Sequence, residues 1–200
     1  PDGARRADDT QLHRGPTTVK ETVLIVIAVL LSGCAGAVFT PVDTAGVRVR
    51  ECMEVQAGGD WNRFTPTGVK HREIWTQHGV TLDQLVFFAG VADGVPLDDL
   101  SPRERKAPAF KATMSPEDVV ALVETMLAGN GGHFELGTLA PARVSDAPGF
   151  RFDFGYTGHN DEVERSGTAV GAIVDGRLYL MIYVAPRGHY HDLGQPGAAR

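Results

Sequence analysis

The sequence is poor in cysteine and in basic residues. Two cysteines among 200 residues exclude the disulfide framework that stabilises many small secreted domains. Acidic residues outnumber basic ones, 25 to 19, and the formal net charge is −6 at pH 7. A chain with this balance is repelled by phosphate backbones unless it carries a dense basic stripe. We therefore expect no nucleic-acid partner.

Familiar catalytic and cofactor motifs are also missing. The chain has no G-x-S-x-G turn, no phosphate-binding glycine loop, no H-E-x-x-H helix and no pair of C-x-x-C motifs. The sequence thus predicts no cofactor and favours a non-catalytic protein. A small enzyme with an unfamiliar site remains the alternative.

The composition that is present fits a folded, turn-rich protein. Hydrophobic residues make up 42% and charged residues 22%, which is typical of a globular domain. The 24 glycines and 12 prolines indicate many turns, so short elements and a sheet are expected rather than long helices.

One apolar run near the N-terminus has the length of an export signal. Residues 23–31 (VLIVIAVLL) are apolar without interruption, and Lys20 precedes them. A helix of this length reaches only about 14 Å, well short of a hydrocarbon core of about 30 Å. Small residues follow, as a signal peptidase requires. We predict an upstream extension plus signal peptide over 1–33, with Val19 as a natural start. A buried strand is the alternative.

The residues that end this run, Leu31-Ser32-Gly33-Cys34, resemble the lipobox of bacterial lipoproteins. In that family the cysteine thiolate accepts diacylglycerol, and cleavage makes the cysteine the new N-terminal residue. The resemblance implies lipidation at Cys34 and a membrane partner held through two or three acyl chains. No aspartate follows Cys34, and by resemblance to the sorting pattern of enteric bacteria this favours the outer membrane over the inner membrane.

The sequence predicts a single domain after the signal peptide. We predict a lipidated tether over 34–46, a domain over 47–187 and a flexible tail over 188–200. Hydrophobic periodicity predicts strands over 47–55, 72–76, 82–91, 133–139, 150–156, 162–174 and 177–184. The connection over 94–114 carries no sustained apolar period, and a loop of this length is usually functional or mobile.

The clearest helix starts at Ser115, whose hydroxyl can cap it, with Pro116 at the first helical position. Apolar residues then fall on one face until Gly129. Together these elements predict an α+β fold: an antiparallel sheet of five to seven strands, with one main helix at about 115–128 packed on one face and the other face wet.

Three aromatic residues form the first candidate binding site. Trp61, Trp75 and Phe88 could line a groove for an apolar ligand between the sheet and the long loop. Aromatic residues at strand positions are more often part of a core, and this alternative stays open.

Two further candidates would serve an enzyme or a metal protein. His189 and His191 lie two positions apart beside Asp192, so both imidazoles would point the same way in an extended segment and could bind a metal. Cys52 lies near Arg48 and Arg50, whose charges could lower its thiol pKa. Solvated histidines and a packing cysteine are the alternatives.

Four short motifs carry a wider resemblance: GDWNRF (59–64), REIWT (72–76), LDQL (82–85) and GFRF (149–152). With these, residues 47–190 resemble a group of uncharacterised proteobacterial lipoproteins. The resemblance implies a fold and an envelope location but no activity. Those proteins continue into an amphipathic closing helix, whereas residues 188–200 are rich in Gly, Pro and Ala, which predicts a truncated or frame-shifted C-terminus. We expect a non-catalytic envelope protein that binds a protein or apolar ligand.

Overall fold

A computed structural model describes residues 38–43, 45–56, 58–65, 72–97, 108–129 and 131–188. All of them belong to the compact unit that spans residues 37–200. Among these residues no helix is long and apolar enough to cross a membrane.

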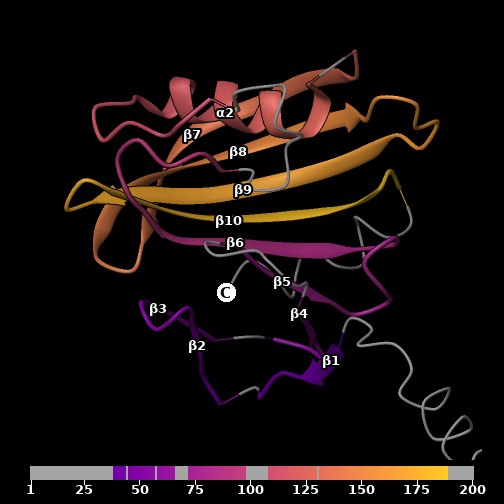
Figure 1. Ribbon diagram of the computed structural model, residues 1–200, viewed down its shortest axis with the longest axis horizontal. Helices are drawn as coiled ribbons and strands as arrows, with labels where there is room; N and C mark the ends of the chain where they lie inside the picture. Colours follow the sequence, from indigo (N-terminus) through magenta and orange to yellow (C-terminus); the bar gives the residue numbers. More distant parts are fainter. Residues whose placement is uncertain are drawn as a thin grey trace, which may run out of the picture. The chain divides into compact units, whose positions relative to one another are not determined.

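A large antiparallel sheet organises the described residues (Figure 1). Its eight strands lie in the order β1-β4-β5-β6-β10-β9-β8-β7, with bounds β1 Val38–Pro41, β4 Asn62–Thr65, β5 Arg72–Thr76, β6 Gln84–Val91, β7 His133–Val144, β8 Ala147–Thr157, β9 Arg165–Val174 and β10 Arg177–Pro186. A separate two-stranded sheet contains β2 (Val47–Val49) and β3 (Met53–Val55). The helix α2 (Pro116–Ala128) packs against β7 and β8.

This architecture corrects the predicted fold class. The described residues form ten strands and one helix, so the fold is β-rich rather than α+β, and its main sheet has eight strands rather than five to seven. The difference comes from the N-terminal part. The predicted strand 47–55 is a hairpin of two strands, the predicted tether contains β1, and β4 was not predicted. Strands of three or four residues carry too few alternations to be recognised by period.

The chain builds the sheet from two meanders. Strands β4, β5 and β6 follow one another at one side, and β7, β8, β9 and β10 return from the far edge until β10 pairs with β6. The turn at Asp175-Gly176 joins β9 to β10, as the Asp-Gly dipeptide predicts. Both turn residues have positive φ angles, 50° and 71°, as a type I′ turn requires.

The helix is confirmed where the sequence predicts it. The Ser115 side chain accepts a hydrogen bond from the Asp118 backbone N–H, and the Asp118 side chain accepts one from the Ser115 backbone N–H. This reciprocal capping satisfies two donors that the first turn would otherwise leave unpaired. The helix then buries one face, including Val119, Val120 and Leu122.

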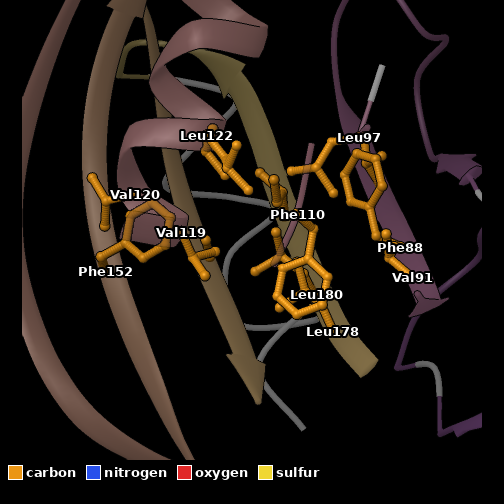
Figure 2. Close-up of a cluster of buried hydrophobic side chains, with 14 of the residues drawn as sticks. Phe88, Val91, Leu97, Phe110, Val119, Val120, Leu122, Phe152, Leu178 and Leu180 are labelled. Atoms are coloured by element: carbon orange, nitrogen blue, oxygen red, sulfur yellow. The ribbon is translucent and has the colours of Figure 1, made fainter. Parts of the chain in front are cut away.

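One hydrophobic core lies between the sheet and α2, and we call it the helix-side core. Figure 2 shows the α2 side chains Val119, Val120 and Leu122 directed toward the strand residues Phe152 and Leu180. The core joins residues from α2, from β5, β6, β8, β9 and β10, and from the 94–114 connection, where Leu97 and Phe110 are buried. The predicted alternation of Phe150, Phe152 and Phe154 on one face is confirmed, because all three are buried here.

Glycines in β9 make room for side chains of its two neighbouring strands, β8 and β10. A Cβ atom at Gly167 would lie 2.3 Å from Cζ of Phe154, and one at Gly171 would lie 2.8 Å from Cδ1 of Leu180. Real Cβ atoms do not approach so closely. The aromatic side chains of β8 therefore pack directly over the β9 backbone.

A second core covers the opposite face of the sheet at β5, β6 and β10, and we call it the hairpin-side core. Alternate residues of these strands point there, so Trp75, Phe87 and Tyr183 lie opposite the helix-side residues. The β2–β3 hairpin packs on this face through Val49, which is fully buried. At this end the sheet is therefore covered on both faces, and the prediction of a wet second face is wrong here. At β8, the strand from which that face was predicted, Arg151 and Asp153 remain partly exposed on it.

Candidate anion-binding pocket

A pocket lined with arginines lies where the β2–β3 hairpin meets β4 and β5. Its volume is about 340 Å³, and its lining residues are Arg48, Arg50, Glu51, Arg63, Phe64, Arg72 and Glu73. Four guanidinium groups against two carboxylates leave an excess of two positive charges in a chain whose net charge is −6. The local charge is thus opposite in sign to that of the whole molecule.

The strand register places two of these residues. Arg63 of β4 lies opposite Trp75 of β5, and Phe64 lies opposite Ile74. Alternation puts Arg63 on the face that the hairpin covers. Arg63 Nε and Glu73 Oε1 are 2.6 Å apart, and the indole N–H of Trp75 donates to the same oxygen at 2.7 Å. Glu73 is therefore held by two partners and fixes Arg63 at the pocket wall.

The hairpin turn supplies the opposite wall. Arg50 and Glu51 have φ angles of 48° and 62°, and the Cys52 backbone N–H donates to the Val49 carbonyl across the turn at 3.2 Å. Glycine and asparagine are the residues that normally occupy such a turn, because a Cβ atom is crowded in left-handed backbone. The turn thus keeps two charged residues in a conformation that is strained for them, a feature often found at functional sites.

One hydrogen bond ties the turn to the sheet. Arg50 Nη2 donates to the Arg72 backbone carbonyl at 2.7 Å. Within the described residues, Arg72 Nε is inaccessible to solvent and has no hydrogen-bond partner. Arg72 lies opposite Phe88 and on the same face of β5 as Ile74, so its side chain is on the helix side of the sheet, not on the face that bears Arg63 and Glu73.

The donor set suits an anion. Guanidinium groups are planar and permanently charged, and they present paired N–H donors that match the oxygens of carboxylates and phosphates. Phe64 also lines the pocket, but its ring packs against the helix-side core, on the face of β4 opposite Arg63. The arrangement can therefore bind an acidic group.

A second hollow of about 260 Å³ lies at β7, β8 and β9. Three of its lining residues are acidic, Glu135, Asp153 and Glu164. Asp153 accepts a hydrogen bond from the Thr168 hydroxyl at 2.7 Å, and Glu164 pairs with Arg187. Because two of its carboxylates already have partners, this hollow offers little to a ligand.

The three aromatic residues of the first predicted site are not brought together. Trp61 and Trp75 are buried in the hairpin-side core, whereas Phe88 is buried in the helix-side core on the other face of the sheet. The Trp61 indole N–H donates to the Gly58 carbonyl at 2.8 Å. All three contribute to packing, which is the alternative that the sequence left open.

Of the other predicted site residues, the structure describes only Cys52. Cys34, His189, His191 and Asp192 lie outside the described residues, so their roles stay predictions. Cys52 is exposed and unpaired by any disulfide, at the end of the hairpin turn. In the described part of the chain, no three His, Cys, Asp or Glu side chains are grouped as metal ligands.

The sequence alone does not predict the arginine pocket. Arg48 and Arg50 enter the sequence-based predictions only as neighbours of Cys52. Arg63 and Arg72 come from other strands, and only strand pairing and the hairpin bring them close. The available signal was the concentration of arginines between positions 48 and 72 of an acidic chain.

Comparisons with known proteins add no assignment. No family model matches the chain, and no curated protein matches it at a significant level.

Proposed function

We propose that this chain is a lipid-anchored protein of the bacterial cell envelope, facing the periplasm from the outer membrane. Its folded unit is a non-catalytic module that binds an anionic ligand in the arginine pocket. The lipobox at residues 31–34 supports the anchor. The excess of two positive charges in one concave site supports the ligand class.

The pocket favours an acidic ligand over a purely apolar one. The large aromatic side chains that could have lined an apolar groove are already packed in the two cores. The guanidinium groups keep their charge at all physiological pH values, so binding should vary little with pH. Binding should weaken as salt rises, since part of the pocket is open to solvent.

The anchor is tested by the intact mass of the protein extracted from membranes of its native host. We expect a chain that begins at Cys34 and carries a diacylglycerol thioether. Cys34→Ala should leave an unprocessed, unlipidated chain. Recovery of wild-type protein in the soluble fraction, with a bare thiol at position 34, would disprove the anchor.

The ligand class is tested by calorimetry on the extracted protein in neutral detergent, with inorganic sulfate and succinate as probe anions. A ligand at a hundred times its Kd adds about 2.7 kcal/mol to stability, so a rise in the unfolding midpoint gives a second readout. Arg48→Gln and Arg63→Gln should weaken binding of whichever anion binds. Arg143→Gln removes an exposed charge on β7 and is the matched control.

If neither anion binds, or if the control variant weakens binding as much as the pocket variants do, the anion-binding proposal is wrong. Arg48 is exposed on a short strand, so its replacement tests the charge without disturbing a core. Loss of binding only in Arg63→Gln, accompanied by a lower unfolding midpoint, would instead indicate a folding defect and count against the pocket.

A further inference from the structure

We propose that Glu73, although negatively charged, strengthens anion binding in the arginine pocket: it is a positioning residue whose carboxylate holds the Arg63 guanidinium with its Nη groups toward the anion. This inference rests on the proposed function, because it assumes that an anion binds in the pocket. It adds the residue that orients the site before the ligand arrives. Glu73 acts through Arg63 and does not itself contact the ligand.

Three side chains on one face of the sheet form a short series of contacts. Glu73 and Trp75 are alternate residues of β5, and Arg63 of β4 lies opposite Trp75, so all three point to the face that the hairpin covers. One oxygen, Glu73 Oε1, lies 2.7 Å from the Trp75 indole nitrogen and 2.6 Å from Arg63 Nε. The indole thus anchors the carboxylate, and the carboxylate holds the arginine.

The contact uses only the inner part of the Arg63 guanidinium. Arg63 Nε is inaccessible to solvent, and its N–H is not aimed at the oxygen closely enough for a hydrogen bond, so the contact is an ion pair. Among the described residues this side chain has no other polar partner, and 33% of it is exposed. The two Nη groups therefore keep the paired N–H donors that match the oxygens of a bound anion.

The burial of Glu73 supports a role beyond stability. The residue is only 8% exposed, and a buried carboxylate is costly unless a cation and hydrogen-bond donors compensate it. Replacing a buried ion pair with apolar groups of similar size is often neutral or even stabilising. A core that needed only packing at this position could thus carry an apolar residue, and the carboxylate is better explained by its hold on Arg63.

The charge of Glu73 has a second effect, which acts in the opposite direction. A carboxylate beside the pocket repels an incoming anion. If repulsion were its whole influence, removing the charge would strengthen binding, whichever residue replaced it. Positioning and repulsion therefore predict opposite signs for the same substitution, and the sign can be measured.

The test uses calorimetry on the extracted protein in neutral detergent, with inorganic sulfate and succinate as probe anions. Glu73→Met keeps an unbranched side chain but has no oxygen, and we expect it to weaken binding of the anion by about tenfold, the usual effect of losing one charged contact. Glu73→Gln keeps an oxygen for the indole and for Arg63, so it should bind nearly as tightly as wild type. If Glu73→Met binds as tightly as wild type or more tightly, the inference is wrong.

The two tryptophans supply a matched pair of variants, which serves even if Glu73→Met does not fold. Trp75→Phe removes the donor that anchors Glu73, whereas Trp61→Phe removes an indole N–H that donates to the Gly58 carbonyl. Both indoles are buried in the hairpin-side core, so both changes should lower the unfolding midpoint. Only Trp75→Phe should weaken anion binding, by about threefold to tenfold. Equal effects of the two variants on affinity would show a general packing defect and overturn the inference.

NMR spectroscopy gives a readout that packing alone does not move. Because the Trp75 N–H and Arg63 share one carboxylate oxygen, an anion that binds Arg63 should shift the resonance of the Trp75 indole N–H. The Trp61 indole N–H donates to a backbone carbonyl and should keep its resonance. An unchanged Trp75 resonance at saturating anion, or an equal shift of both indoles, would contradict the inference.

The outcome for the proposed function can be read separately. If Arg48→Gln weakens binding while Glu73→Met strengthens it, the pocket binds an anion without a positioning residue, and only this inference fails. If the wild-type protein binds neither sulfate nor succinate, both proposals are wrong.

Discussion

Asp83 is a buried carboxylate that holds the turn between β5 and β6. Its oxygens accept hydrogen bonds from the Thr76 hydroxyl at 2.9 Å, from the Gln77 backbone N–H at 2.9 Å and from the His78 backbone N–H at 2.7 Å. The Thr76 hydroxyl in turn accepts one from the Gly79 backbone N–H at 2.8 Å. This side chain therefore satisfies donors that a wide turn would leave unpaired.

We predict that Asp83→Asn lowers the free energy of unfolding by about 2 to 3 kcal/mol, because the amide places a donor against a buried backbone donor. Urea unfolding followed by tryptophan fluorescence measures the change. Asp60→Asn, the same replacement at an exposed position, should stay within about 0.5 kcal/mol of wild type. Equal effects of the two variants would contradict this role of Asp83.

Tyr183 gives the domain a pH dependence in the alkaline range. Its burial in the hairpin-side core raises the pKa of its hydroxyl to about 12, and the negative charge of Asp83 contributes. The folded state therefore holds this proton more tightly than the unfolded state, whose tyrosine pKa is about 10. Stability from this group is complete below about pH 10 and is lost as the pH rises toward about 12.

We predict that Tyr183→Phe removes up to about 2.7 kcal/mol of the fall in unfolding free energy between pH 10 and pH 12. Urea titrations at several alkaline pH values measure this slope. Tyr179→Phe on the same strand is the matched control and should keep the wild-type slope. An unchanged slope in Tyr183→Phe would mean that another group causes the alkaline loss.

At the scale of elements, strand length decided what the sequence could predict. β8, β9 and β10 have ten or eleven residues each, enough to show alternation, and the Asp-Gly dipeptide marked the turn between the last two. β1 and β4 have four residues each and gave no usable pattern.

The β2–β3 hairpin explains an apparent exception in that pattern. Val47 and Val49 lie opposite Val55 and Met53, so all four share a face although the chain reverses between them. The period-two pattern therefore predicts correctly that these side chains share a face, but it does not predict the turn between the two strands. Glu51, the residue that broke the alternation, lies within the turn itself.

We predict that Gly167→Ala destabilises the domain by about 1 to 3 kcal/mol, because the new methyl group would overlap the Phe154 ring. Gly155→Ala is a matched control, since it lies opposite Ser166 on the neighbouring strand and its Cβ atom would be 3.8 Å from the nearest atom, the Arg165 carbonyl oxygen. The control should be neutral or slightly stabilising. Thermal unfolding of both variants compares them directly.

At the scale of the whole molecule, the sheet is shared between two cores. Neighbouring residues of one strand serve both, as Val86 and Phe87 do in β6 and as Ile182 and Tyr183 do in β10. Loss of either core would leave an apolar face of these strands in water. We therefore expect the described unit to unfold as one cooperative system.

The two tryptophans make this expectation measurable. Trp61 and Trp75 both lie in the hairpin-side core, so their fluorescence reports on that face, while circular dichroism at 222 nm reports on α2 at the other. We predict that both signals give the same urea midpoint within error. Separated midpoints would show that the two cores unfold independently.

The pocket belongs to this scale as well. Its arginines come from β2, the hairpin turn, β4 and β5, and a single-sequence reading has no means of placing these segments next to one another. Periodicity assigns a residue to a face, but the partner strand depends on tertiary pairing. The arginines of the pocket therefore form one site only because the β2–β3 hairpin packs on the sheet beside β4 and β5.

Because β6 pairs with β10, the last strand of the sheet in sequence order, one edge of β6 can pair only when synthesis of the sheet is nearly complete. Leu85 of β6 lies opposite Tyr183 of β10, and the whole of β7, β8 and β9 is synthesised between them. A nascent chain that emerges with its N-terminus first must keep one side of β6 unpaired until the last strand arrives. A ribosome stalled before Arg177, the first residue of β10, would thus release a molecule with an open strand edge, the kind of edge that promotes aggregation.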